Sequence, residues 1–343
     1  MNLTVVLTRD FDQMSAAAAD VALSDIQSGL AADGRFTLGL ATGASPTGLY
    51  KHLAKAANAG AFDPRQVRSF NLDEYVGLPG DNAQKRALHP ESYSFFMIRE
   101  LFGLVRRPFA ETDVPYGCLI EQERLVQELA AHPGDWEEQG ADKGKAIVIK
   151  RDAESEYLRW IRREILDGYA ERIASAGGIG LHVIGVGGRG HVAFHESGIP
   201  FEGNGMLLVK LDANTVENAV TDGHFATAEE SPRYAISMGA ELVYQAKHVM
   251  MLASGSRKSE PVAASLLGGV DPTVPISYGQ RLAEKEGGRV TYVLDEAAAA
   301  ETLAHRAEIE AKGIRFLDLR GETGGKKVSE LAFTRDPASG LMG

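Results

Sequence analysis

The sequence predicts an α/β protein: a Rossmann-like, doubly wound and mostly parallel sheet with helices on both faces. Short apolar runs rich in β-branched residues alternate with longer stretches of helical periodicity. Strands that are apolar on both sides must be covered on both sides, which is typical of parallel sheets. The 343 residues, 44% of them hydrophobic, suffice for one such domain over residues 1–343.

The expected strands and helices follow one another along the chain. The strands are expected at Leu3–Thr8, Phe36–Thr42, Val67–Leu72, Gly180–Gly187, His248–Ser254 and Arg289–Asp295. The helices between them are expected at Met14–Ala32, Thr47–Ala57, Glu154–Ala174 and Pro261–Leu267. In a doubly wound sheet, ligands bind beyond the carboxyl ends of the strands. The residues that follow each strand are therefore the candidates for a site.

Two segments lack this alternation. Residues 119–151 are highly charged, and we expect a surface insertion there rather than a second core. Residues 321–343 are rich in glycine, and we expect a loose C-terminal tail.

The composition bears on several classes of protein. A net charge of −11 argues against sequence-independent nucleic-acid binding, which needs a surplus of Lys and Arg. Cys118 is the single cysteine, so neither an intrachain disulfide nor a thiolate metal cluster can form. The first residues resemble no secretory signal, and no apolar run is long enough to span a membrane. We therefore expect a cytoplasmic protein.

The fourth strand runs into a glycine-rich segment, VIGVGGRGHVAFHES, which contains the pattern G-x-G-x-x-G. In a dinucleotide-binding fingerprint a helix follows this pattern, and a second strand ends in an acid such as Asp212. Residues 198–205 contain three glycines and one proline and cannot form that helix. We favour the alternative, a tight turn that presents His191 and Glu196 to a ligand at the end of a central strand.

A pair of carboxylates follows the third strand. Asp73 and Glu74 are neighbours on an extended chain and point to opposite sides, so at most one of them faces the same cleft. Partial burial raises the pKa of a carboxyl group towards neutrality and suits it to act as a general base. A helix cap or a surface salt bridge is the structural alternative.

The second strand is followed by a turn at Thr42–Ser45. We expect free backbone amides at the positive end of the next helix to cradle an anion such as phosphate, namely those of Gly43, Ala44 and Ser45. Ser45 is expected to cap that helix and Pro46 to be its first residue. The fifth strand is followed by Arg257 and Lys258, one of which could supply a cation for the same anion, unless both are solvated surface residues.

Together these segments resemble the glucosamine-6-phosphate deaminase (isomerase) family, whose fold is shared with 6-phosphogluconolactonases. The resemblance covers most of the chain from about Leu38 to Asp295, outside residues 119–151. It lies in the segments LGLATGASPTGLYKHL, FNLDEYVGL, HPESYSFFM, GVGGRGHVAFHE, SPRYAISMG and ASGSRK, and the second and third of these are typical of the deaminase branch. The resemblance implies a small sugar phosphate as the partner, no cofactor, no metal and a homo-oligomer.

Position by position, the resemblance assigns roles to the candidate residues. It implies that Asp73 moves a proton between the first two carbons of the opened sugar, that His191 opens the ring and that Glu196 supports His191. The turn Thr42–Ser45 and Lys258 match the phosphate-binding elements. The implied reaction converts glucosamine 6-phosphate, or a close relative, to a ketose phosphate and ammonia.

Some positions depart from the family. Arg189 stands where an aspartate is usual, and we expect it to bind the substrate. Val220 falls at the position of a phosphate-binding arginine and cannot contact phosphate by charge. Met206 and Leu208 fall near the basic positions of an allosteric site, so we expect that regulation to be absent.

Two alternatives stay open: a 6-phosphogluconolactonase-like hydrolase, and a catalytically inactive sugar-phosphate-binding protein.

Overall fold

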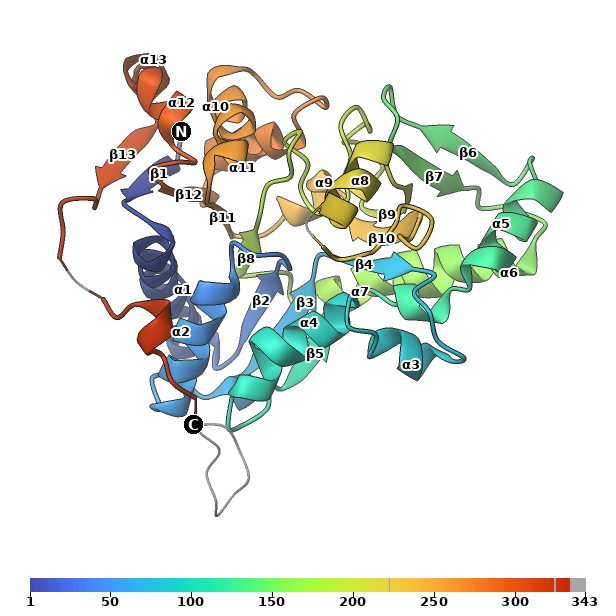
Figure 1. Cartoon of the computed structure of the whole chain (residues 1–343), viewed down its shortest axis with the longest axis horizontal. Coiled ribbons are helices and arrows are strands. Elements are labelled where there is room, and N and C mark those ends of the chain that lie inside the picture. The colour runs from blue at the N-terminus through green and yellow to red at the C-terminus, as the bar shows by residue number, and fades with distance from the viewer. Residues whose placement is uncertain (222, 324, 334–343) are drawn as a thin grey trace.

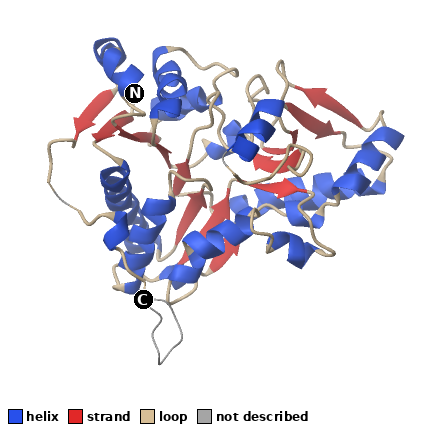
Figure 2. Ribbon diagram, in the orientation of Figure 1, coloured by secondary structure: helices blue, strands red, loops and turns tan. Residues whose placement is uncertain are grey.

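The computed structural model describes residues 1–221, 223–323 and 325–333. Two sheets with helices packed around them make up this part of the chain (Figures 1 and 2). Of the tail expected at 321–343, residues 324 and 334–343 lie outside the described residues. No described helix combines the length and the apolar character needed to cross a bilayer.

The first sheet has eight strands in the order β13-β1-β12-β11-β8-β2-β3-β5, and every pair of neighbours is parallel. Its strands are β1 (Leu3–Thr8), β2 (Phe36–Leu40), β3 (Val67–Asn71), β5 (Glu111–Asp113), β8 (Leu181–Ile184), β11 (His248–Ala253), β12 (Arg289–Asp295) and β13 (Arg315–Asp318). All six predicted strands are present. In this sheet the two edge strands, β5 and β13, were not predicted.

Helices cover both faces of this sheet, which confirms the predicted fold class. One face packs against α1 (Phe11–Asp33), α2 (Thr47–Asn58) and α4 (Tyr93–Glu100). The other packs against α7 (Gly168–Ser175), α9 (Ala240–Val243), α10 (Ser259–Leu267), α11 (Gly279–Glu284), α12 (Ala300–Ala304) and α13 (Arg306–Ala311). The helix expected at Glu154–Ala174 is a run of α6 (Glu156–Trp160), a π-helical segment (Ile161–Asp167) and α7.

The second sheet was not predicted. It has five antiparallel strands in the order β4-β10-β9-β7-β6, on the right of Figure 1. They are β4 (Asp73–Val76), β6 (Trp136–Gln139), β7 (Lys145–Ile149), β9 (Met206–Lys210) and β10 (Tyr234–Met238). Around it lie α5 (Gln122–Ala131), α6 and α8 (Ala213–Thr221), and the short α3 (Ala83–Ala87) follows β4 in the chain.

Residues 119–151 differ from the expected surface insertion. They supply α5, β6 and β7, and they contribute to a second hydrophobic core through Ile120, Leu125, Ile147 and Ile149. The strands β6 and β7 are antiparallel, and the hydrophobic core covers them mainly on one side. Polar side chains occupy the other side, which explains the high charge of this segment.

Candidate active site

The strand order brings four predicted loops to one edge of the first sheet. β11, β8, β2 and β3 are consecutive neighbours and parallel, so their carboxyl ends share that edge. The chain builds outward from β2 to one side and from β8 to the other, which makes the boundary between β2 and β8 a topological switch point. Ligands of doubly wound proteins bind at such a point.

The glycine-rich turn after β8 holds His191 against the backbone. The amide of Gly187 donates to the carbonyl of His191 at 3.0 Å, and Gly190 has a φ of +77°. A Cβ atom on Gly187 would lie 1.8 Å from Nε2 of His191, so only glycine fits there. Residues 191–205 contain no helix. The glycines therefore serve a turn and a close approach of the histidine, and the segment lacks the helix of a dinucleotide fingerprint.

His191 and Glu196 form the pair that the sequence predicts. Nδ1 of His191 lies 3.5 Å from Oε2 of Glu196, and the two side chains are 19% and 4% exposed. Between them, Ala193 has a φ of +50°, a left-handed conformation that is uncommon for a residue with a side chain and that clusters at functional sites.

Further contacts fix the carboxylate of Glu196. Oε1 accepts hydrogen bonds from the hydroxyl of Thr215 at 2.7 Å and from the amide of Asp212 at 3.4 Å. Burial raises the pKa of Glu196, but His191, Thr215 and the Asp212 amide together bring that pKa below its usual value. Glu196 is therefore an anion that orients the ring of His191.

Glu74 is the structural member of the carboxylate pair after β3. Its oxygens accept hydrogen bonds from the amides of Tyr75, Tyr93 and Ser94 and from the hydroxyls of Ser92 and Ser94. These donors include the first amides of α4, so Glu74 caps that helix. Burial still raises the pKa of Glu74, and the hydrogen bonds oppose the rise. The capping explains why the segments FNLDEYVGL and HPESY occur together.

Asp73 is the other member of the pair, and unlike Glu74 it has no structural hydrogen-bond partner among the described residues. It is 6% exposed, and its carboxylate forms no hydrogen bond within the part of the chain that the structure describes. Burial, and then the nearby charge of Glu74, raise its pKa well above the usual range. A buried carboxylate that is not committed to a structural partner is suited to accept and return a proton.

The turn at Thr42–Ser45 presents unused amides. Gly43 has a φ of +91°, and the amides of Gly43, Ala44 and Ser45 make no hydrogen bond with other described residues. The helix α2 begins at Thr47, as its expected range has it, but the expected cap is wrong: Pro46 occupies the capping position and Ser45 does not cap the helix. Thr47 instead donates its amide and hydroxyl to the carbonyl of Ala44 at 3.3 and 2.8 Å. The turn keeps the geometry of an anion cradle.

Lys258 lies in the corresponding turn after β11. Gly255 there has a φ of +90°, and Asp295 of β12 accepts from its amide at 3.1 Å and from the hydroxyl of Ser254 at 2.6 Å. This anchoring starts the short helix Ser256–Lys258 at the same edge of the sheet as the Thr42–Ser45 turn.

The two departing residues have partners within the protein. Arg189 is 41% exposed, and its Nη1 lies 3.0 Å from Oδ2 of Asp212, while its Nη2 pairs with Asp142. Val220, on α8, packs against the hydrophobic cluster that contains Tyr75. No sequence pattern indicated Asp142, Thr215 or the hydrogen bond from Ser92 to Glu74, because each of these contacts joins residues far apart in the chain.

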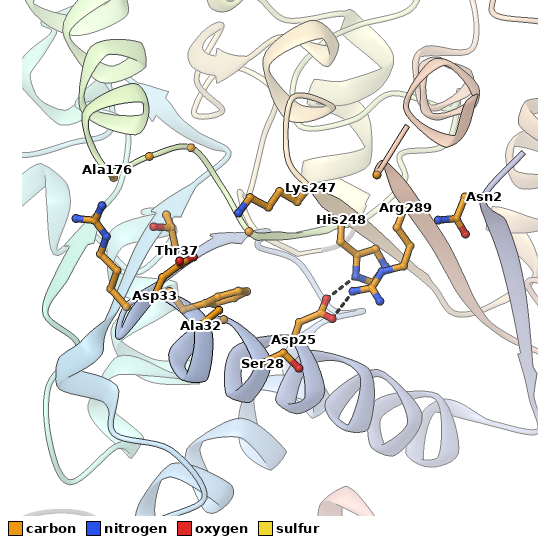
Figure 3. A pocket seen from close by; sticks show the side chains of 17 residues that line it. Asn2, Asp25, Ser28, Ala32, Asp33, Thr37, Ala176, Lys247, His248 and Arg289 are labelled. Atoms are coloured by element: carbon orange, nitrogen blue, oxygen red, sulfur yellow. Dashed lines mark hydrogen bonds and ion pairs between the residues drawn. The ribbon is translucent and has the colours of Figure 1, made fainter. Parts of the chain in front are cut away.

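A cavity of about 750 Å³ lies elsewhere, at the amino ends of the strands (Figure 3). There the ring of His248 forms two hydrogen bonds, from Nδ1 with the carboxylate of Asp25 at 2.5 Å and from Nε2 with the hydroxyl of Thr291 at 2.9 Å. Arg289 also pairs with Asp25. These residues start β11 and β12, so the cavity faces away from the carboxyl ends that carry His191 and Asp73. No group of described His, Cys, Asp and Glu residues could hold a metal ion.

Comparison with known proteins identifies the family. No protein-family model matches the chain. It is 30% identical over 298 residues to the glucosamine-6-phosphate deaminase of Thermoanaerobacter sp. (strain X514), over 87% of this chain and 94% of that protein. It is 35% identical over 263 residues to that of Rhodopirellula baltica, over 77% of this chain and 83% of that protein. The chain belongs to the glucosamine-6-phosphate deaminase family. This confirms the resemblance inferred from the motifs.

Solved structures share the fold of this deaminase-family chain. A monomeric glucosamine-6-phosphate deaminase matches with a TM-score of 0.64 at 22% identity, over 87% of this chain and 100% of that one. The 6-phosphogluconolactonase of Trypanosoma brucei matches with a TM-score of 0.59 at 17% identity, over 87% and 98%. Proteins with two different activities thus share the architecture, and the choice between those activities depends on the site.

Proposed function

We propose that this chain is an isomerising deaminase that converts glucosamine 6-phosphate, or a closely related amino sugar phosphate, and water to a ketose phosphate and ammonia. The observation that carries the proposal is the contrast between Asp73 and Glu74. The family of deaminases to which the chain belongs supports the reaction, and the buried, uncommitted carboxylate of Asp73 supplies the base that such a reaction needs.

His191 would open the sugar ring. Ring opening moves a proton from the anomeric hydroxyl to the ring oxygen, a task for which an imidazole is suited near neutral pH. Glu196 stays ionised and accepts from Nδ1, so that Nε2 is the nitrogen that exchanges the proton with the substrate. Because Thr215 and the Asp212 amide fix Glu196, the ring of His191 is oriented before the sugar binds.

Asp73 would then act on the open-chain amino sugar. It removes the proton from the second carbon to form an enolamine and returns a proton to the first carbon. The resulting ketose imine takes up water and releases ammonia, which leaves a ketose phosphate. The raised pKa of Asp73 favours the first step, because a carboxylate with a higher pKa is a stronger base towards the proton on the second carbon. The acid formed in that step then returns the proton to the first carbon.

The phosphate would bind at the Thr42–Ser45 turn. The amides of Gly43, Ala44 and Ser45, which make no hydrogen bond with other described residues, supply donors, and Lys258 supplies a positive charge from the turn after β11 at the same edge of the sheet. Val220 packs in a hydrophobic cluster and contributes no charge to this binding. The backbone amides therefore contribute a larger share of the binding than they would beside an arginine.

Ammonia release from glucosamine 6-phosphate by the purified protein tests the proposal. We expect turnover that Asp73→Asn abolishes. Acid release from 6-phosphogluconolactone is the matched assay for the alternative hydrolase, which needs a water-activating histidine but not Asp73. Binding of fructose 6-phosphate without turnover in either assay would instead favour an inactive binding protein. A cytoplasmic location and a homo-oligomeric state stay predictions from the sequence.

A further inference from the structure

The sequence predicts that Arg189 binds the substrate, but its guanidinium already contacts two carboxylates. Nη1 lies 3.0 Å from Oδ2 of Asp212, and Nη2 pairs with Asp142. Asp212 is 4% exposed, so Arg189 is the cation that compensates a buried charge. One cation between two anions leaves no surplus positive charge for a substrate group.

One end of this ion-pair chain, Asp142–Arg189–Asp212, reaches Glu196. The amide of Asp212 donates to Oε1 of Glu196 at 3.4 Å. The carboxylate of Asp212 accepts from the amide of Asn214 at 2.9 Å, which holds the start of α8, where Thr215 donates to the same Oε1. The position of Asp212 therefore sets both donors that orient Glu196.

The other end lies in the loop between β6 and β7, residues 140–144. This loop packs directly on the catalytic segment: a Cβ atom on Gly144 would lie 2.5 Å from Cβ of Glu196. The amide of Ala141 donates to the carbonyl of Gly198 at 2.9 Å, and a Cβ atom on Gly198 would lie 3.1 Å from the amide nitrogen of Asp142. The second sheet thus places a carboxylate beside Arg189 through backbone contacts that are independent of the ion pair.

We propose that Asp142 is a positioning residue for the deaminase reaction: from the β6–β7 loop it fixes Arg189, and through Asp212 it holds Glu196 and the ring of His191 in their working geometry. This inference deepens the proposed function and rests on it for its kinetic consequence. It also gives residues 119–151 a role, because β6 and β7 exist as a hairpin whose loop completes the surroundings of the His191–Glu196 pair.

The direction in which the pKa of Glu196 changes distinguishes a specific effect of Asp142 from a general loss of structure. Charged or titratable groups that face Glu196 are His191, His195 and Asp212, with Arg189 behind Asp212. Asp142→Asn leaves Arg189 with one carboxylate and should lower the pKa of Glu196. Arg189→Gln leaves Asp212 uncompensated and should raise that pKa. We expect shifts of about half a unit in opposite directions, since the pair is partly exposed.

The experiment compares Asp142→Asn with a matched control on the same hairpin. Glu138 of β6 pairs with Lys210 at 3.1 Å, and both side chains are exposed, so Glu138→Gln removes an equivalent ion pair away from the site. Carbon-13 NMR of the full chain with labelled glutamate measures the pKa of the Glu196 carboxyl in the absence of substrate. The Glu196→Gln variant identifies the resonance of that carboxyl. Ammonia release gives kcat and KM over pH.

We expect Asp142→Asn to lower kcat about 3- to 10-fold and to move the titration of the Glu196 carboxyl to lower pH, with Glu138→Gln within twofold of the parent. Equal behaviour of the two variants, or shifts of Glu196 in the same direction in Asp142→Asn and Arg189→Gln, would overturn the inference. If the parent releases no ammonia but Glu196 shifts as expected, the proposed function fails and the positioning stands.

Discussion

Replacing Asp73 and Glu74 one at a time should separate catalysis from stability at two neighbouring carboxylates. Asp73→Asn removes the base but keeps the shape and polarity of the side chain. General bases contribute about 10²- to 10⁴-fold, so we expect kcat for ammonia release to fall by that factor, which is about 3–5 kcal/mol of activation free energy. Because Asp73 makes no hydrogen bond with described residues, no structural partner is lost.

The same variant should be more stable than the parent at neutral pH. The pKa of Asp73 is raised in the folded state, so its contribution to stability is greatest below the unfolded pKa and is lost as pH rises towards the folded pKa. Each unit of such a rise corresponds to about 1.4 kcal/mol at a pH above both values. The neutral amide does not carry this penalty, and we expect the melting temperature to rise by a few degrees.

Glu74→Gln is the matched comparison. In the parent, amides and hydroxyls at the start of α4 donate to the two carboxylate oxygens of Glu74. Glutamine replaces one of these oxygens by an NH2 group, which is itself a donor, so hydrogen bonds worth about 1.5–3 kcal/mol each are lost. Relief of the buried charge offsets part of this, and we expect a net loss of about 2–4 kcal/mol and a melting temperature lower by about 5–10 °C. Retention of a tenth or more of the activity in Asp73→Asn, or a loss of stability in that variant, would refute the reasoning.

Three further outcomes follow from the structure. Gly39→Ala should yield little folded protein in an expression and melting assay, because its Cβ atom would lie 1.9 Å from the buried ring of His182. Burial lowers the pKa of His182 and of His195 to about 4, so acidification from pH 6.5 towards 4 should remove about 3 kcal/mol of stability for each histidine, measured by urea titration. Gly43→Ala should raise KM with kcat little changed, because the φ of +91° that aims the amides of the turn is strained for alanine.

The sequence predicted the first sheet because its strands are buried on both faces. The runs at Leu3–Thr8 and Arg289–Asp295 match β1 and β12 residue for residue. The short edge strands β5 and β13 carry too few apolar residues to be recognised. In the second sheet, β6 has the sequence WEEQ, whose charges face solvent, and this strand becomes stable only by pairing with β7.

The candidate site was predictable where local sequence determines it. Glycines in a turn and a carboxylate after a strand are visible in one dimension, and so His191, Glu196 and Asp73 could be named in advance. Which of two adjacent carboxylates is free was not predictable, because the capping partners of Glu74 lie on α4, about twenty residues later in the chain. The pairing of Arg189 with Asp142 was hidden for the same reason: it joins the turn after β8 to the loop of a hairpin that the sequence did not reveal.

The two sheets divide the chemistry of the proposed site between them. The phosphate site that we propose uses turns after β2 and β11 of the first sheet, where amides must stay exposed to meet a charged ligand. The groups that we propose for proton transfer have surroundings that the second sheet completes: Asp73 begins β4, Asp212 follows β9, and Asp142 comes from the β6–β7 loop. Burial is the main cause of the raised pKa of Asp73, and β10 of the second sheet pairs with β4 beside it, with Ser237 opposite Asp73. Without that burial the pKa of Asp73 would fall towards its ordinary value, and the proposed base would bind the proton less strongly.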